Sequence, residues 1–457
     1  MHIKSIRVLL VGYLGIILLG TLLLSMPDMY HTNVSFLDAL FTSVSAVTCT
    51  GLIVKDTALD FTIYGQIVIL ILIQFGGFGY MSMAGILYLI IGKKLSAQEK
   101  NLINVIENLN NKSINGVDKV VKHALFFVLS TECIGALVLS LYFSLKLHNI
   151  KEGVWAGIFH SIAAFNNSGF TIFKNSLINY QGDMFVNFFV ASLVIIGGIG
   201  YVSSLEISSF CLSKVFYRII YHTDYKRRLS LNAQIVLIVS TLLVLLGMLN
   251  ILIFEWSNPK TFASIPFWEK IMNSFFASVN YRTAGYNIFD MSGFDDRTMF
   301  FSTLFMLIGG SPGGTASGIK VTTFAVLISL STSIIRNHKQ TTIFRRAIPQ
   351  EIVAKALSVF VIATIYIFVS VFLLSIFEPN VRFLPLLFET ISAFSTVGLS
   401  MGDGGVLSLC AKFNTIGLII IMVLMISGKI GVLAFTLVFI GNTKSKHAQY
   451  VQERVLI

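Results

Sequence analysis

Four short polar stretches, each ending in a glycine, interrupt a chain that is otherwise mostly apolar. The glycines are Gly51, Gly169, Gly285 and Gly398, so the intervals between them are 118, 116 and 113 residues. A ring of backbone carbonyls can replace the hydration shell of a cation, and aiming successive carbonyls at one axis needs positive φ angles that glycine adopts at little steric cost. The spacing therefore predicts four repeats around one pore, each contributing part of a cation filter. The expected filter residues are Val47, Thr48, Cys49, Thr50, Gly51, Asn166, Asn167, Ser168, Gly169, Tyr281, Arg282, Thr283, Ala284, Gly285, Ser395, Thr396, Val397 and Gly398.

These glycines have a simpler alternative explanation. Each glycine could end the short helix before it as a helix cap. That explanation suits one copy and fits poorly with four copies at matched positions. Because potassium is larger and more easily dehydrated than sodium, it is the cation expected to bind at such filter backbone carbonyls.

The rest of the sequence indicates which elements position these stretches. Hydrophobic residues make up 55% of the 457 residues, charged residues make up 12%, and the mean hydropathy is +0.81, which places the chain in a bilayer. Shorter apolar stretches near 36–47, 154–165, 267–279 and 384–394 precede the filters and are typical of re-entrant pore helices. Apolar runs long enough to cross a hydrocarbon core of about 30 Å lie near residues 6–26, 64–91, 121–145, 184–213, 233–254, 298–335, 352–377 and 413–441.

We therefore expect an all-α integral membrane protein built from four repeats. Each repeat has a first membrane helix, a re-entrant pore helix and a second membrane helix (M1-P-M2), giving eight transmembrane helices and four pore helices around one pore. The expected repeats are residues 1–115, 116–229, 230–346 and 347–457. The third has a broken second helix with a gating loop, and the fourth ends in a cytoplasmic C-terminal tail.

The second membrane segment of every repeat contains glycines, and those of the third repeat predict a gate. In repeats one, two and four, Gly77, Gly198 and Gly428 indicate either close helix packing or a bend. The third repeat has too many glycines, and a proline, to remain a continuous helix, so we expect a polar loop at mid-membrane that can obstruct the pathway. The expected gate residues are Gly309, Gly310, Ser311, Pro312, Gly313, Gly314, Thr315, Ala316, Ser317, Gly318, Lys320 and Lys429.

The charged residues within or beside the apolar segments leave several roles open. Glu132 is a candidate functional residue by its position in a membrane segment, or it bonds a neighbouring helix. Asp38 and Glu389 lie in pore helices, where we expect them to hold filter backbone amides rather than touch the ion. Lys320 and Lys429 are expected to form an electrostatic barrier near the gate, or to pair with acids such as Glu206.

The distribution of charge predicts the topology and excludes other classes of function. The N-terminus and the segments after each second span are strongly basic, while the segments that hold the pore helices are net acidic, so both termini are expected in the cytoplasm. The basic runs at 226–228 and 345–346 lie in short loops beside spans, which argues against nucleic-acid binding. A membrane-embedded enzyme would need a nucleophile, a metal cluster or paired acids within the bilayer, and the sequence shows none of these. An ion-coupled secondary transporter of potassium or sodium remains the alternative, since it would also show repeats and broken helices.

At these motifs the chain resembles the potassium-translocating subunits of the Ktr/Trk/HKT superfamily, and the KtrB type most closely. The resemblance covers the full length. Glycine in the first filter, where some sodium-carrying plant relatives have serine, favours potassium. The motifs are 38–41 leading to 50–52, 159–161 leading to 166–170, 282–285, 388–389 leading to 395–399, and the broken segment ending at 317–320.

The resemblance implies an assembly and a mode of control. It implies a homodimer with one pore per subunit in a bacterial plasma membrane, and an intramembrane gating loop that matches residues 309–318. It also implies a cytoplasmic nucleotide-binding ring of the KtrA type, so nucleotide would bind that partner and no cofactor would bind this chain. Where this chain has Lys429, the family commonly has arginine. Lysine keeps the positive charge and loses the forked donor geometry of arginine.

Overall fold

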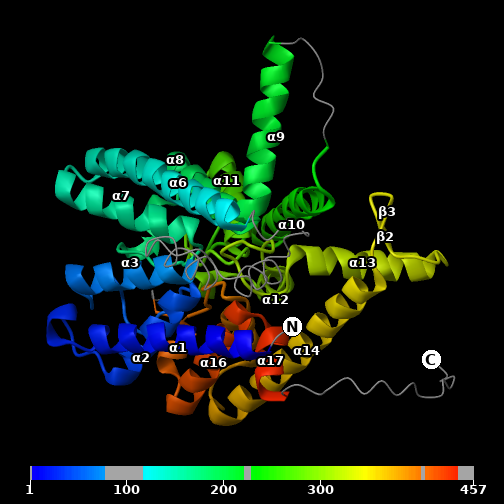
Figure 1. Cartoon of the computed structure of the whole chain (residues 1–457). Helices are drawn as coiled ribbons and strands as arrows, with labels where there is room; N and C mark the ends of the chain where they lie inside the picture. The colour runs from blue at the N-terminus through cyan, green and yellow to red at the C-terminus, as the bar shows by residue number, and fades with distance from the viewer. Residues whose placement is uncertain (1–2, 78–116, 221–227, 403–406, 441–457) are drawn as a thin grey trace.

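The chain folds into a bundle of helices. The computed structural model describes residues 3–77, 117–220, 228–402 and 407–440 (Figure 1), and within them the expected all-α class is confirmed. The small elements between the helices are β1 (Lys174–Leu177), β2 (Thr342–Ile343) paired antiparallel with β3 (Arg346–Ala347), and the 3-10 turns η1 (Pro27–Met29), η3 (Ile178–Tyr180), η4 (Met291–Gly293) and η5 (Leu409–Lys412).

Each of the four stretches expected to form the filter, which we call the filter segments, is preceded by a long helix and then a short one. The long helices are α1 (Ile3–Leu24), α6 (Val117–Lys146), α10 (Leu231–Glu255) and α14 (Gln350–Phe377). Three of them, α6, α10 and α14, contain an uninterrupted apolar segment long enough to cross a membrane. The short helices, which we call pore helices, are α2 (Phe36–Thr48), α7 (Ile150–Phe165), α11 (Phe267–Asn280) and α15 (Phe383–Ser395).

The second membrane segments are broken in the third repeat, as expected, and also in the second and fourth repeats. The expected spans at 184–213 and 413–441 are each broken at a glycine, and the span at 298–335 is broken by a loop; the span at 64–91 is described only as far as α3. Gly200 and Gly431 have positive φ angles of +82° and +94°, a conformation that ends a helix readily only at glycine, and the axis turns by 113° at the first of these breaks. The resulting elements are α3 (Ile63–Gly77), α8 (Met184–Ile199) with α9 (Tyr201–Ile220), α12 (Asp296–Leu307) with α13 (Val321–Ile335), and α16 (Thr415–Ile430) with α17 (Val432–Ile440).

The two explanations left open for the glycines of the second helices both apply. Besides the bends, Gly76, Gly197 and Gly428 lie against the carbonyl oxygens of Val47, Phe165 and Phe394, so a Cβ at any of the three would collide with the end of a pore helix. Small residues allow this close approach of two backbones.

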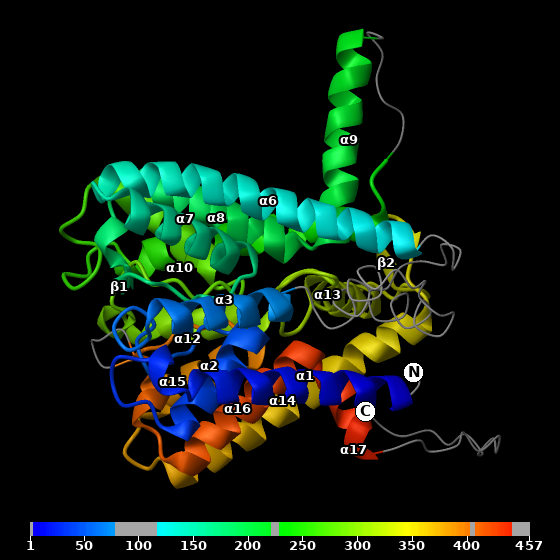
Figure 2. The same cartoon turned by 60° about the vertical axis from the view of Figure 1, so that its left-hand side comes forward.

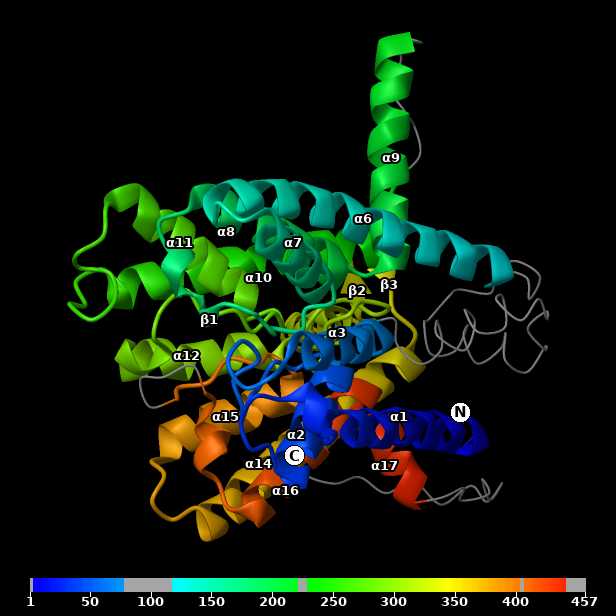
Figure 3. The same cartoon turned by 90° about the vertical axis from the view of Figure 1, so that its left-hand side faces the viewer.

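The pore helices pack in a ring. Each contacts the long helix before it, and each also contacts the second helix of the preceding repeat: α7 contacts α3, α11 contacts α8, and α15 contacts α12. The ring is closed because α2 contacts α16, which comes from the other end of the chain. Figure 2 shows α6, α7 and α8 in one half of the bundle and α1, α2 and α16 in the other, and Figure 3 shows α12 beside α15. The four filter segments therefore meet at the centre.

Candidate functional site

The pore helices α2, α7 and α15 end in the same turn, which directs three of the four filter segments. In α2 the amide of Thr50 donates to the carbonyl of Ser45 at 2.8 Å, and matching bonds close α7 and α15, as in a Schellman cap. The left-handed residues of these caps are Cys49, Asn167 and Thr396, with φ angles of +53°, +53° and +51°. The cap residue thus lies two positions before the filter glycine, and the explanation of these glycines as helix caps does not hold.

The four filter glycines form a closed ring. All have positive φ angles, of +88° at Gly51, +70° at Gly169, +74° at Gly285 and +85° at Gly398. A Cβ on Gly51 would lie 2.9 Å from the Cα of Gly169, and one on Gly169 would lie 3.0 Å from the Cα of Gly285. A Cβ on Gly285 would lie 3.3 Å from the Cα of Gly398, and one on Gly398 would lie 3.1 Å from the Cα of Gly51. The neighbours in the ring follow the order of the chain.

Backbone oxygens surround this ring. The atom that each added Cβ would approach is the carbonyl oxygen of the residue just before the next glycine, at 2.5 Å for Ser168, 3.0 Å for Ala284 and 2.7 Å for Val397, and in contact for Thr50. One carbonyl from each repeat thus lies at the same level. Such a layer is chemically suited to replace the water molecules around a monovalent cation.

The third filter segment departs from the other three through Arg282. The buried Arg282 side chain donates from Nη1 to the carbonyls of Ile308, at 3.0 Å, and Gly309, at 2.9 Å. These carbonyls lie where α12 ends and would otherwise lack donors, because the helix stops in the middle of the protein. The backbone carbonyl of Arg282 accepts from Asn167 Nδ2 at 3.2 Å. Arg282 therefore ties the broken helix to the third filter segment, and Asn167 ties that segment to the second.

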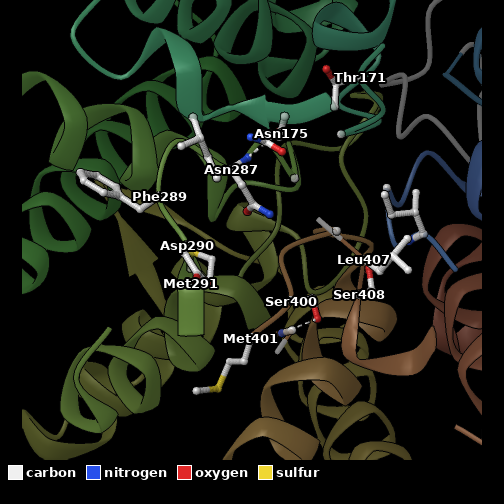
Figure 4. A pocket seen from close by; sticks show the side chains of 18 residues that line it. Thr171, Asn175, Asn287, Phe289, Asp290, Met291, Ser400, Met401, Leu407 and Ser408 are labelled. Carbon is white, nitrogen blue, oxygen red and sulfur yellow. Dashed lines mark hydrogen bonds between the residues drawn. The ribbon is translucent and has the colours of Figure 1, made fainter. Parts of the chain in front are cut away.

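A cavity lies on one side of the ring (Figure 4). All four filter glycines line it, together with the residues two positions after them, which are Ile53, Thr171, Asn287 and Ser400. The exposed Asp290 also lines the cavity, so a carboxylate lies at the entrance to the ring. A negative charge in such a vestibule raises the local concentration of cations.

The loop at 309–318 lies against the filter segments. Its neck is closed by backbone bonds from Gly309 N to Ile319 O at 2.9 Å and from Val321 N to Gly310 O at 3.1 Å. Beyond the neck, the amide of Ser311 donates to the carbonyl of Gly198 at 3.1 Å, at the end of α8. A Cβ on Gly318 would lie 3.2 Å from the side chain of Ser395, at the start of the fourth filter segment. The helix break expected here is confirmed.

Both lysines near the loop bond its backbone. Lys320 Nζ donates to the Ala316 carbonyl at 2.6 Å, and Lys429 Nζ, which comes from α16, donates to the Thr315 carbonyl at 3.0 Å. The expected alternative, in which these lysines pair with Glu206, is wrong. The carboxylate of Glu206 instead accepts from the amide and hydroxyl of Ser230 at 2.6 and 2.7 Å, at the start of α10.

Two of the acidic residues singled out in the sequence, Glu132 and Asp38, have different roles. The buried Glu132 accepts from Gln74 of α3, at 2.9 and 3.1 Å, and from Asn166 Nδ2 of the second filter segment at 2.9 Å, so it bonds neighbouring elements. Asp38 forms the capping box of α2 with Ser35, and the expectation that it holds filter amides is wrong.

Glu389 does hold a backbone amide, but one outside the filter. Its carboxylate accepts from the amide of Cys410 at 3.1 Å and from the hydroxyl of Ser400 at 2.6 Å. Polar residues in two other pore helices have comparable roles that were not expected from the sequence. Ser45 Oγ accepts from the amide of Gly51 at 3.1 Å, and His160 bonds the hydroxyl beyond the second filter. Their polarity within otherwise apolar pore helices was the signal that could have found them.

The expected filter and gate residues come together around one axis of the fold. Val47, Thr48 and Ser395 belong to the last turns of their pore helices, and every expected filter residue is buried. Among the described residues, no group of His, Cys, Asp and Glu could hold a metal ion, and the four cysteines are free thiols.

Comparison with known proteins gives matches over nearly the whole chain. The profile of the TrkH family, described as cation transport protein, matches residues 16–448. The Ktr system potassium uptake protein B of Bacillus subtilis (strain 168) is 38% identical over 444 residues, which cover 97% of this chain and 94% of that protein. The potassium/sodium uptake protein NtpJ of Enterococcus hirae is 31% identical over 463 residues, covering 100% and 98%. The crystal structure of the potassium transporter TrkH from Vibrio parahaemolyticus has the same fold, with a TM-score of 0.73 over 96% of this chain and 85% of that chain at 16% identity.

Proposed function

This chain belongs to the TrkH family of cation transport proteins, and from that membership we propose that it takes up potassium across the plasma membrane through a pore lined by its four filter segments. The observation that carries the proposal is the closed ring of Gly51, Gly169, Gly285 and Gly398. At the ring the four chain segments approach through glycine backbone, so backbone carbonyl oxygens are the groups close to it that could replace the water around a cation. Relatives named for potassium uptake support the choice of ion.

We propose that the loop at 309–318 is the gate. It approaches the fourth filter segment through Gly318 and the end of α8 through Ser311. Its glycines leave it free to adopt other conformations at small steric cost. Lys429 and Lys320 each donate one hydrogen bond to it, and these bonds favour the conformation in which the loop lies under the filter.

The proposed assembly follows the resemblance to Ktr subunits. We propose a homodimer with both termini in the cytoplasm, controlled by a cytoplasmic nucleotide-binding ring of the KtrA type that carries the nucleotide itself. The proposed repeat boundaries remain 1–115, 116–229, 230–346 and 347–457. The excess of basic residues on the proposed inner face, expressed in the net charge of +11, suits both the topology and an acidic partner surface.

Ion-coupled transport is the second candidate. The observations in its favour are the likeness to a protein named for uptake of both potassium and sodium and the broken second helices, which coupled transporters also have. The two candidates differ in what drives the flux. A pore conducts potassium down its own gradient in the absence of other ion gradients, whereas a coupled transporter requires the second ion.

Growth of a strain that lacks potassium uptake tests the proposal. The chain, produced with and without a KtrA-type partner, should restore growth at low potassium, and purified protein in liposomes should pass potassium in preference to sodium. Absence of growth and of flux, with the protein present in the membrane and its partner supplied, would contradict the proposal. Flux that stops when sodium and proton gradients are removed would favour the coupled transporter.

A further inference from the structure

Two positions can be compared in all four repeats. The earlier position lies in the pore helix, nine residues before the filter glycine, and the later position lies two residues after that glycine. The later positions all line the cavity above the ring (Figure 4). In two repeats the side chains at the earlier and later positions are hydrogen-bonded to each other. The earlier positions hold Thr42, His160, Phe276 and Glu389, and the later positions hold Ile53, Thr171, Asn287 and Ser400.

In the second repeat the pair is His160 and Thr171. His160 is fully buried in α7, and its Nδ1 lies 2.8 Å from the Ala156 carbonyl. A carbonyl can only accept, so Nδ1 carries the proton and Nε2 accepts from the hydroxyl of Thr171 at 2.9 Å. The Thr171 oxygen in turn accepts from the amide of Phe173 at 3.0 Å. The ring of Phe173 stacks on the imidazole, with centroids 4.4 Å apart, and fixes its plane.

In the fourth repeat the pair is Glu389 and Ser400. Glu389 is fully buried in α15 and accepts from the hydroxyl of Ser400 at 2.6 Å. The Ser400 oxygen accepts from the amides of Gly402, at 3.2 Å, and Leu409, at 2.8 Å. The arrangement matches that of the second repeat. In both, a hydroxyl donates to a buried acceptor on the pore helix and accepts from the backbone of the segment that leaves the filter.

The other two repeats lack this connection. In the first, the buried hydroxyl of Thr42 has no hydrogen-bond partner and the later residue is Ile53. In the third, the pore-helix residue is Phe276, which has no polar group. Because the ring of glycines follows the order of the chain, the two bonded repeats lie opposite each other, and each is flanked by two unbonded ones.

We propose that His160 and Glu389 are positioning residues that set the preference for potassium over sodium. Through their bonds to Thr171 and Ser400 they hold two opposite filter segments at a fixed distance from the pore axis. Neither residue reaches the ring of glycines. Selectivity between two cations of equal charge depends on where the carbonyls are held, so a bond two residues beyond the glycine acts on the segment that carries them. Figure 4 shows Thr171 and Ser400 reaching the cavity from different segments.

The test compares variants that remove the acceptor with variants that keep it. His160→Phe and Glu389→Leu should lower the potassium-to-sodium flux ratio in liposomes by about two- to tenfold each, the range expected for one hydrogen bond. His160→Gln and Glu389→Gln keep an acceptor for the hydroxyl and should retain most of the ratio. Thr171→Val and Ser400→Ala remove the other partner with a smaller change of volume, and they test the same bond should the pore-helix variants fail to fold.

Thr42→Val provides the matched control. Thr42 occupies in α2 the position that His160 and Glu389 occupy in their pore helices, but its hydroxyl makes no hydrogen bond. The potassium-to-sodium flux ratio of this variant should equal that of the parent. Normal ratios in the folded Thr171→Val and Ser400→Ala proteins would overturn the proposal, as would a loss in Thr42→Val as large as theirs. The inference rests on the proposed function, and failure of the proposed filter can be told apart from failure of the role given to the two bonds. A parent protein that does not distinguish potassium from sodium would refute the proposed filter, whereas a selective parent with equally selective variants refutes only the role of the two bonds.

Discussion

Serine at each filter glycine should reduce potassium selectivity by an amount that depends on the position. All four glycines have φ angles between +70° and +88°, a region that costs a residue with a Cβ roughly 1 to 2 kcal/mol. That cost alone corresponds to about a five- to thirtyfold loss of discrimination if it falls on the selective conformation. The steric part differs between positions. At Gly169 the nearest atoms to a new Cβ are 3.0 Å away, while at Gly398 it would collide with the carbonyl of Thr50.

We therefore expect Gly169→Ser to keep the most selectivity and Gly398→Ser the least. Reversal potentials in planar bilayers, or potassium and sodium fluxes in liposomes, give the ratio directly. Gly15→Ser in α1 is the control, because a Cβ there meets no atom within 4 Å. If all four filter variants kept the preference of the parent, the carbonyl ring would not be the filter. If Gly169→Ser lost more selectivity than Gly398→Ser, the steric reasoning would be wrong.

Three further changes test the gate and the entrance. Shortening the loop within 311–317 should raise potassium flux in the absence of the cytoplasmic partner and leave the ion ratio unchanged; liposome flux no faster than that of the parent would place the gate elsewhere. Lys429→Met removes the charged donor to Thr315, a bond worth roughly 1.5 to 3 kcal/mol, and should increase partner-free flux by about tenfold or more, whereas Lys429→Arg should not. Asp290→Asn should raise the potassium concentration for half-maximal uptake at low ionic strength and have no effect at high salt, where screening removes the long-range attraction; an effect independent of salt would rule out electrostatic concentration at the entrance.

The repeat pattern of the sequence predicted those parts of the fold that depend on local composition. Apolar length and glycine spacing located the short helices and the four glycine turns after them, because a helix of about a dozen apolar residues followed by a polar turn has few other solutions in a membrane. For the second helices the same reasoning predicted the break of the third repeat, but in the other repeats it left close packing and a bend as alternatives. An apolar run such as 184–213 has no hydropathy signal at Gly200, and only the packing of a neighbouring backbone decides between a straight helix and a break.

The partners of polar side chains far apart in the chain could not be predicted from the sequence. Arg282 bonds the carbonyls of Ile308 and Gly309, which are distant in the chain, and Glu206 bonds Ser230 rather than a lysine. Each buried polar group must find a partner, but which partner it finds depends on helix rotation and depth. Composition alone gives neither quantity.

The contacts of the third repeat suggest how the proposed gating loop moves while the proposed filter stays in place. The neck of the loop is held by the bonds between Gly309 and Ile319 and between Gly310 and Val321, and Arg282 binds the same neck from the filter side. Moving the neck would leave a buried guanidinium without acceptors, a penalty of roughly 1 to 3 kcal/mol or more for a charged group. Beyond the neck, the contacts of residues 311–318 include the bond from Thr315 N to Gly197 O at 3.3 Å and the two lysine bonds, and breaking them leaves the acceptors of Arg282 in place. Opening should therefore occur by displacement of these residues about a stationary neck, which leaves the third filter segment in place and keeps gating separate from selectivity.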